Sequence, residues 1–167
     1  MELKFSMKLV LFAFLVCTVL ASCKKGDKLE DDIAKINIDI GVERFDRLFA
    51  EATSESLKEL KERYPFMFSK KYPDTFWLAK IADTLQIQLF KEIDKNFAHF
   101  DDLEVEIEDL FNHLKYYFPE FKAPRIITVT NDVDYRNKVI VTDTIAVIAL
   151  DTYLGSEHEF YGAIPKY

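Results

Sequence analysis

Apolar residues recur at steps of three or four through the middle of the chain, which places them on one face of an α-helix. Pro73 followed by Asp74 marks the start of one such helix, and Asp83 with Gln86 three residues later forms a capping box that starts a second. We therefore predict two consecutive helices, whose apolar positions are Phe76, Trp77 and Ile81, and then Leu85, Leu89, Ile93 and Phe97.

The stretch that follows fits two patterns at first. Residues 103–107 alternate apolar and acidic side chains, as a half-buried strand would. Helical spacing nevertheless continues over four turns to Phe118, and Asp101 with Glu104 places carboxylates in the first turn, where they stabilise a helix. We therefore predict a helix from Asp101 that ends at Pro119, because the residue before a proline disfavours helical geometry.

Nearer the N-terminus, four β-branched residues alternate with polar residues or glycine over Ile36–Val42, which predicts a strand with one apolar face. Helical spacing resumes at Phe45–Phe49, where Asp46 lies near the start and can accept free amides. A further helix is expected over about residues 54–63, because Pro65 disfavours its continuation.

After Pro124 the chain becomes rich in Ile, Val and Thr. Three stretches separated by polar turns predict strands at Arg125–Thr130, Lys138–Thr142 and Thr144–Leu150. Their short connections favour an antiparallel meander. The predicted fold class is therefore α+β, with an N-terminal strand, about four to five helices and a three-stranded antiparallel meander.

The first residues have the order of a secretory signal. Lys4 and Lys8 precede an apolar run, Leu9–Leu20, which is shorter than the ~20 residues that span a membrane. The run ends in Leu-Ala-Ser and then Cys23, which resembles the lipobox of bacterial lipoproteins. The resemblance implies cleavage before Cys23 and acylation of that residue; the alternative is an unrelated cysteine after an ordinary signal.

This organisation divides the chain into a signal peptide (1–22), a charged tether (23–33) and a single α+β domain (34–167). Removing the signal takes away two lysines and one glutamate, so the net charge changes from −7 to −8. That balance argues against nucleic acid as a partner. It also argues against electrostatic docking on anionic lipid, so membrane attachment would rest on the acyl chains on Cys23.

Few residues offer chemistry. The mature chain keeps no cysteine besides Cys23, and its four glycines form no phosphate-binding loop. His158 and Glu159 resemble the start of a zinc helix, but Gly162 stands where the second histidine is required. His99 and His113 also lack a partner histidine one helical turn away. We therefore predict no metal site and no cofactor.

Three other groups of residues have both a functional and a structural interpretation. Asp132, Asp134 and Asn137 could bind calcium, but the glycine turn and closing glutamate of a calcium loop are absent, so turn chemistry is favoured. An acid–base pair could come from the acidic residues of 104–109, but a solvated helix face explains them. The fifteen Phe and eight Tyr residues could line a ligand groove, although core packing is favoured.

Several segments together resemble one family. They are Ile-Asp-Ile-Gly-Val-Glu-Arg-Phe-Asp-Arg-Leu-Phe at 38–49, Tyr-Pro-Phe-Met-Phe at 64–68, Tyr-Tyr-Phe-Pro-Glu-Phe-Lys-Ala-Pro at 116–124, Ala-Leu-Asp-Thr-Tyr-Leu-Gly at 149–155, and Ile-Pro-Lys-Tyr at 164–167. In order and spacing, and with the lipobox, they resemble GldB, the gliding motility lipoprotein family of the Bacteroidetes.

The resemblance implies a lipid-anchored component required for gliding motility and linked to type IX protein secretion, without established catalytic activity. Its expected partners are the membrane, through Cys23, and other gliding or secretion proteins. The Lys24-Lys25-Gly26-Asp27 sequence lacks an acidic surface-export signal, so we expect the anchored protein to face the periplasm.

Family members continue beyond the Ile-Pro-Lys-Tyr segment, so this chain is expected to be the N-terminal part of a longer family domain. Two alternatives stay open. One is a metallopeptidase-like cell-envelope enzyme whose active site lies in a missing C-terminal half. The other is a periplasmic ligand-binding module that uses the aromatic residues.

Overall fold

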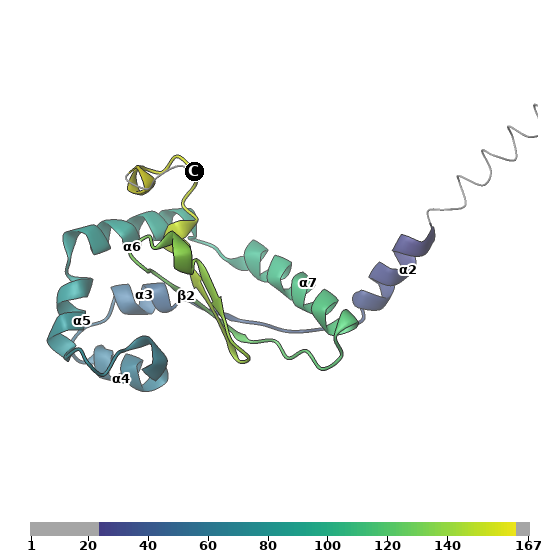
Figure 1. Cartoon of the computed structure of the whole chain (residues 1–167), viewed down its shortest axis with the longest axis horizontal. Helices are drawn as coiled ribbons and strands as arrows, with labels where there is room; N and C mark the ends of the chain where they lie inside the picture. The colour runs from purple at the N-terminus through teal and green to yellow at the C-terminus, as the bar shows by residue number, and fades with distance from the viewer. Residues whose placement is uncertain (1–23, 163–167) are drawn as a thin grey trace, which may run out of the picture. The chain divides into compact units, whose positions relative to one another are not determined.

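The computed structural model describes residues 24–162 of the chain, which form two compact units. The first contains the residues up to Ile38 together with Asp109–Phe121, and the second contains Asp39–Glu108 together with the residues from Lys122 onward. Helix α7 (Asp101–Tyr117), labelled in Figure 1, contributes residues to both units. No helix of the described residues is long and apolar enough to cross a membrane.

The first unit contains α2 (Lys24–Ile33) and the C-terminal part of α7. We expected a solvated tether in place of α2, but the segment is helical and its last residue, Ile33, is buried. The backbone N–H of Ile38 donates to Asn112 at 3.0 Å. After α7, the Lys115 ammonium donates to the carbonyls of Pro119 and Phe121, and so satisfies backbone acceptors where the chain leaves the helix.

The second unit contains a four-stranded sheet in the order β1-β2-β4-β3. The strands are β1 (Val42–Glu43), β2 (Arg125–Val129), β3 (Val139–Val141) and β4 (Ile145–Ala149). The α+β class and the three C-terminal strands are confirmed. The pairing is more mixed than a simple meander: β3 and β4 form an antiparallel hairpin, whereas β2 pairs with β4 and with β1 in parallel.

Five predicted helices precede the sheet's second strand and are confirmed: α3 (Phe45–Ala50), α4 (Ser56–Arg63), α5 (Asp74–Ile81), α6 (Thr84–Asn96) and α7. Asp83 is the N-cap of α6 as predicted, because its carboxylate accepts the amides of Leu85 and Gln86. The reciprocal bond of a capping box is absent, since the Asp83 amide donates to the Lys80 carbonyl and not to the Gln86 side chain. Short 3-10 turns lie at Pro65–Met67, Tyr135–Asn137, Leu150–Thr152 and Glu159–Tyr161.

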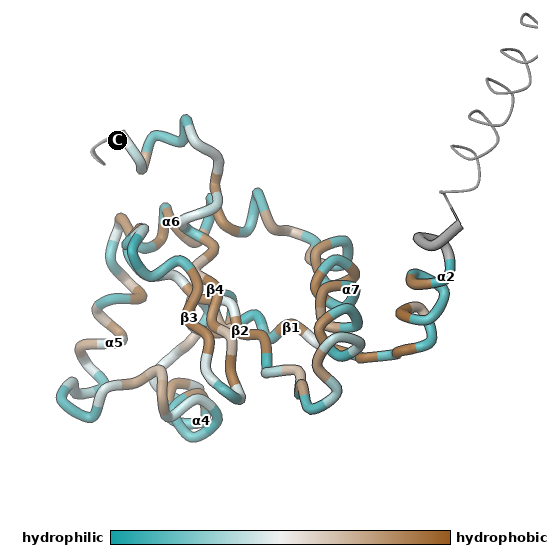
Figure 2. The backbone as a smooth tube through the Cα atoms, turned by 45° about the vertical axis from the view of Figure 1, so that its right-hand side comes forward, coloured by the Kyte–Doolittle hydropathy of each residue, from teal (hydrophilic) through white to brown (hydrophobic). Residues whose placement is uncertain are grey.

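Apolar clusters cover both faces of the sheet. On one face, Ile127 and Val129 of β2 pack in a cluster with Phe45, Phe49 and other residues of α3 and α4. The second cluster is built around Ile93, Phe100, Leu150 and Leu154 and includes Ile148 of β4. Figure 2 shows the apolar character of β2 and β4, the two central strands. Burial of both faces explains why these strands are nearly continuous runs of apolar residues.

The predicted strand over residues 36–42 is wrong in its extent, because only Val42–Glu43 joins the sheet. The alternation itself is real: residues 36, 38, 40 and 42 are half-buried and those between them are exposed. In the second unit, the amides of Ile40 and Val42 donate to the carboxylates of Glu108 and Glu104 at 3.4 and 3.0 Å. Helix side chains therefore replace the strand partner that the pattern implied.

Candidate functional site

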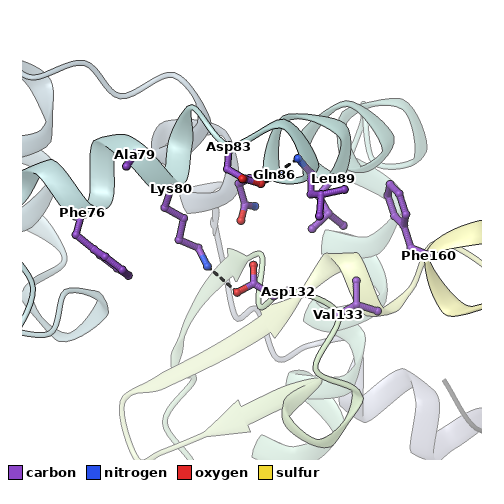
Figure 3. Close-up of a pocket in the computed structure, with 10 residues that line it drawn as sticks. Phe76, Ala79, Lys80, Asp83, Gln86, Leu89, Asp132, Val133 and Phe160 are labelled. Atoms are coloured by element: carbon purple, nitrogen blue, oxygen red, sulfur yellow. Dashed lines mark hydrogen bonds and ion pairs between the residues drawn. The ribbon is translucent and has the colours of Figure 1, made fainter. Parts of the chain in front are cut away.

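An open pocket of about 580 Å³ lies in the second unit, beside the loop that follows β2. Its walls come from α5, α6, the loop after β2 and the turn at Glu159–Tyr161 (Figure 3). The carboxyl ends of parallel strands are a common place for ligands, because the loops that leave them converge there. The lining residues are Phe76, Ala79, Lys80, Asp83, Leu85, Gln86, Leu89, Asp132, Val133 and Phe160.

The pocket is apolar on its walls and carries charge at one side. Lys80 and Asp132 form an ion pair of 2.6 Å, which Figure 3 shows as a bridge between α5 and the loop after β2. Leu85 is 67% exposed and Phe76 40% exposed, so much of the apolar wall faces solvent. Apolar walls with a few placed polar groups are typical of ligand pockets.

Two further polar residues of the pocket are fixed by hydrogen bonds. Asp83 is held by the two amides at the start of α6. Gln86 is buried, and its Nε2 donates to the Thr130 hydroxyl at 3.1 Å, which joins α6 to the end of β2. The side chains that could orient a ligand are therefore already placed.

The loop after β2 has a strained backbone. Asp132 and Val133 have φ values of 58° and 59°, the left-handed region that a β-branched residue such as Val133 adopts at a cost. The Asp151 carboxylate holds this conformation, because it accepts the amide of Asn131 at 3.0 and 3.2 Å and that of Val133 at 2.7 Å. Strain of this kind persists only where the surroundings enforce it, and it is frequent at functional sites.

Asp151 is a fully buried carboxylate in the 3-10 turn Leu150–Thr152, two residues after the end of β4. Burial raises its pKa, and the amides of Val133 and Asn131 oppose that rise because they favour the charged form. The residue therefore connects the end of β4 to the shape of the pocket without lining it.

A second polar centre lies where β1 ends. The Asp46 carboxylate is buried, and the Arg44 guanidinium donates to it through Nε at 3.0 Å and Nη2 at 2.7 Å. The Thr128 hydroxyl of β2 donates to the same carboxylate, and Arg44 Nη1 donates to the carbonyl of Phe97 at 2.7 Å. Asp46 was expected to cap α3, but its side chain makes no cap hydrogen bond and forms this buried pair instead.

Glu43 is the centre of a neighbouring cluster. Arg125 donates to it through Nε and Nη2 at 2.8 and 3.0 Å, and the Tyr64 hydroxyl donates at 2.8 Å. The hydrogen bonds from Arg125 hold the pKa of Glu43 below its ordinary value. Burial, followed by the hydrogen bond to Glu43, raises the pKa of Tyr64. The carboxylates of Asp46 and Glu43 therefore both have hydrogen-bond donors within the fold, which offsets the cost of removing their charges from water.

The residues singled out in the sequence are dispersed. Cys23 lies outside the described residues. His99 is exposed, and His113 lies beside Glu30 and Asp109 in the first unit. His158 contacts Glu92 at 3.3 Å, and its ring lies 4.8 Å from that of Phe160 at an interplanar angle of 55°. Within residues 24–162, no three His, Cys, Asp or Glu side chains are grouped so that they could hold a metal ion.

The acidic face of α7 differs from the predicted solvated face. Glu106 and Asp109 are exposed as expected, but Glu104 and Glu108 are half-buried and accept the amides described above. Sequence alone missed this role because nothing in the helix pattern indicates which extended segment lies against it. The spacing of four between the two glutamates is the one available signal, since it places them on the same face.

The loop at 131–137 does use its polar residues for turn geometry. Asp134 accepts the amide and guanidinium of Arg136, and Asn137 donates to it at 2.9 Å. These contacts, the Arg136 side chain first, lower the pKa of Asp134 to about 2. Asp132 is the exception, because it turns to Lys80 and lines the pocket.

The aromatic residues divide between the two interpretations that the sequence left open. Phe45, Phe49, Tyr64 and Phe68 are buried in the core, where their rings make edge or stacked contacts. Phe76 and Phe160, in contrast, line the pocket. A pocket position has no periodic signature, so the sequence could not separate the two groups.

Comparison with known proteins gives one match. The family model described as "Gliding motility protein GldB" matches residues 26–167, which is most of the chain and includes both units. No curated protein and no solved structure matches the chain. The family expected from the segments at 38–49, 64–68, 116–124 and 149–155 is confirmed: the chain belongs to the GldB family of gliding motility lipoproteins.

Proposed function

We propose that this chain is a lipid-anchored, noncatalytic component of the gliding machinery, linked to type IX protein secretion. The observation that carries the proposal is the family match over residues 26–167, together with the Leu-Ala-Ser-Cys sequence directly before the matched region. Acyl chains on Cys23 would hold the protein at the cell envelope, facing the periplasm. Its partners would be other proteins of the gliding or secretion machinery.

The pocket supports a binding role more than a catalytic one. Lys80 is paired with Asp132, Asp83 caps α6, and Gln86 is bonded to Thr130. A general base or nucleophile must be free to exchange a proton with its substrate, whereas each of these groups is already engaged within the fold. The arrangement suits a surface that receives a partner or ligand without transforming it.

The anchor is tested with the substitution Cys23→Ala in a gliding strain that lacks its own copy of the gene. Stable attachment requires more than one acyl chain, so loss of the acylated residue should release the protein from membranes and abolish or reduce gliding. Membrane fractionation after a high-salt wash and single-cell tracking of gliding on agar measure the two effects.

Cys17→Ala is the matched control, since Cys17 lies in the apolar signal and is removed with it in the proposed scheme. That variant should stay in the membrane fraction and support gliding. If Cys23→Ala behaves in both assays as Cys17→Ala does, the lipid anchor proposed here is wrong.

A further inference from the structure

Strand β3 forms an outer edge of the sheet and carries three consecutive β-branched residues, Val139, Ile140 and Val141. They are 47%, 49% and 67% exposed, although each is a residue type that normally packs. Their cross-strand partners on β4 are Ile148, Val147 and Ala146. Apolar surface therefore continues from the buried sheet onto an edge that faces solvent on both sides.

The register shows which main-chain groups of this edge are free. The Lys138 carbonyl accepts from Ala149, and the Thr142 amide donates to Ile145. Hydrogen-bonded pairs alternate along an antiparallel ladder, so Lys138, Ile140 and Thr142 face β4. The N–H and C=O groups of Val139 and Val141 point the other way, and no hydrogen bond within residues 24–162 reaches them.

At the opposite edge of the sheet, side chains occupy the backbone amides. The amide of Ile40, before β1, and that of Val42, the first residue of β1, donate to glutamates of α7. Natural sheet edges are usually protected by a very short edge strand, proline, a bulge, a charged side chain or a covering element. Strand β3 is only three residues long, but residues 139–141 contain no proline or charge, and their pairing with β4 is regular. The β3 edge is therefore apolar, with regularly paired backbone, and such an edge can accept another strand.

Charged residues at the two ends of the β3 edge indicate which charges a pairing strand would carry. Lys138 lies at the start of β3 with its Nζ 5.8 Å from the centre of the Tyr153 ring. Asp143 lies just beyond the other end. Among the residues that the structure describes, neither forms an ion pair. A strand that pairs antiparallel to β3 would run from Asp143 toward Lys138 and could neutralise both.

We propose that β3 is a docking edge for an extended segment of a partner protein, which adds to the sheet as an antiparallel strand. The segment pairs through main-chain groups with Val139 and Val141. It carries apolar or β-branched side chains, a basic residue near its start beside Asp143, and an acidic residue near its end beside Lys138. Main-chain hydrogen bonds supply affinity in this mode and the side chains supply specificity. The inference does not depend on the anchor at Cys23.

Hydrogen exchange on the full chain, purified in detergent, tests the proposal directly. The probe is a short synthetic peptide in which valine and threonine alternate between an N-terminal lysine and a C-terminal glutamate. Its addition should slow exchange of the Val139 and Val141 amides by about tenfold or more, since both gain a hydrogen-bond partner. The matched control peptide has N-methyl groups on alternate amides, which removes the donors on its pairing edge.

Equal protection by the N-methylated peptide, or no protection by either peptide, would overturn the proposal. Protection that rises with protein concentration in the absence of peptide would place a second copy of the chain on the edge, and would also overturn it. The hydrogen-exchange experiment needs no substitution in the protein, so it tests the docking edge even where a variant fails to fold.

Substitutions give a second measure. Val141→Pro removes one outward N–H while the amides of Ile140 and Thr142 stay free to pair with β4, a position that edge strands tolerate. It should weaken binding of the labelled peptide at least about tenfold, measured by fluorescence anisotropy. The control is Val105→Lys, which changes a valine of similar exposure (63%) on α7 and should leave the affinity for the peptide unchanged. Lysine is used there because proline would break the helix. Equal affinity of both variants would contradict the proposal.

Discussion

Two aspartates of the second unit are buried, and the fold stabilises them in different ways. Asp46 forms an ion pair with the guanidinium of Arg44 and accepts a hydrogen bond from the hydroxyl of Thr128. Asp151 faces only backbone amides, so burial dominates and its pKa rises. The Asp46 charge is compensated by a neighbouring cation, whereas the Asp151 carboxylate is held by the amides of the loop that it shapes. Asp151 and the loop beside the pocket therefore depend on each other.

Replacing Asp151 with alanine should destabilise the protein and disturb the pocket. The variant leaves the amides of Asn131 and Val133 without their acceptor, which costs about 1–3 kcal/mol when such groups are buried. Urea unfolding followed by circular dichroism measures the loss. Asp143→Ala, at an exposed position without an ion pair in the described chain, should have little effect. Equal stability of the two variants would show that Asp151 does not hold the loop.

Glu43 predicts an acid-sensitive contribution to stability. Its pKa in the folded protein lies below the ordinary 4.5, chiefly through the hydrogen bonds from Arg125. A lowered folded-state pKa gives stability that is present above the unfolded value and is lost as the pH falls through the folded value. The urea midpoint of Glu43→Gln should therefore change less than that of the unmodified protein as the pH falls from about 6 to 3.

Glu106→Gln is the control for this pH series, since Glu106 is an exposed glutamate on α7. Its urea midpoint should follow the unmodified protein at every pH. Parallel curves for Glu43→Gln and the unmodified protein would mean that the cluster with Arg125 and Tyr64 contributes no acid-dependent stability.

At the level of the elements, the helices and the antiparallel pairing of β3 with β4 were predictable, whereas the partners of β2 were not. Local signals define α5, α6 and α7: a proline before the first, Asp83 before the second and Asp101 at the start of the third. Strand pairing depends on residues far away. Strand β2 has two parallel partners: β4 lies twenty positions later, beyond β3, and β1 lies before α3. No local pattern encodes that order.

The same limit explains the segment before β1. Alternation of half-buried and exposed residues predicts an extended conformation correctly, but it says nothing about what satisfies the amides. Here the acceptors are Glu104 and Glu108. Two residues of extended chain rise ~6.6 Å and four residues of helix ~6 Å, so alternate amides can meet carboxylates spaced by four. That match of spacings is visible in the sequence only once the helix and the segment are known to be neighbours.

The start of α6 offers a clean test of a local signal. Asp83 accepts the amides of Leu85 and Gln86 at 2.9 and 3.1 Å. Asp83→Ala should therefore destabilise the protein by about 1 kcal/mol, whereas Asp83→Asn keeps an effective cap and should lose much less. Thermal or urea unfolding distinguishes them. A loss of the same size in both variants would point to the charge of Asp83 and not to its capping bonds.

For the whole molecule, family membership was predictable while the site was not. The resemblance rested on segments spread over the chain, and the matching family model spans residues 26–167. The pocket, in contrast, is assembled from α5, α6 and two loops that are distant in sequence. One signal did exist for it: Asp151 lies two residues after β4, and a charged residue near the carboxyl end of a parallel strand frequently serves a site.

The left-handed backbone at Val133 has a consequence for substitutions at this position. Glycine at that position would relieve the strain and favour the same loop, so a more stable sequence lies one substitution away. The chain instead keeps a valine whose side chain lines the pocket. Selection for thermal robustness alone would remove that side chain. Directed evolution of this protein for heat resistance should therefore enrich glycine at position 133 and, with it, change the wall of the pocket.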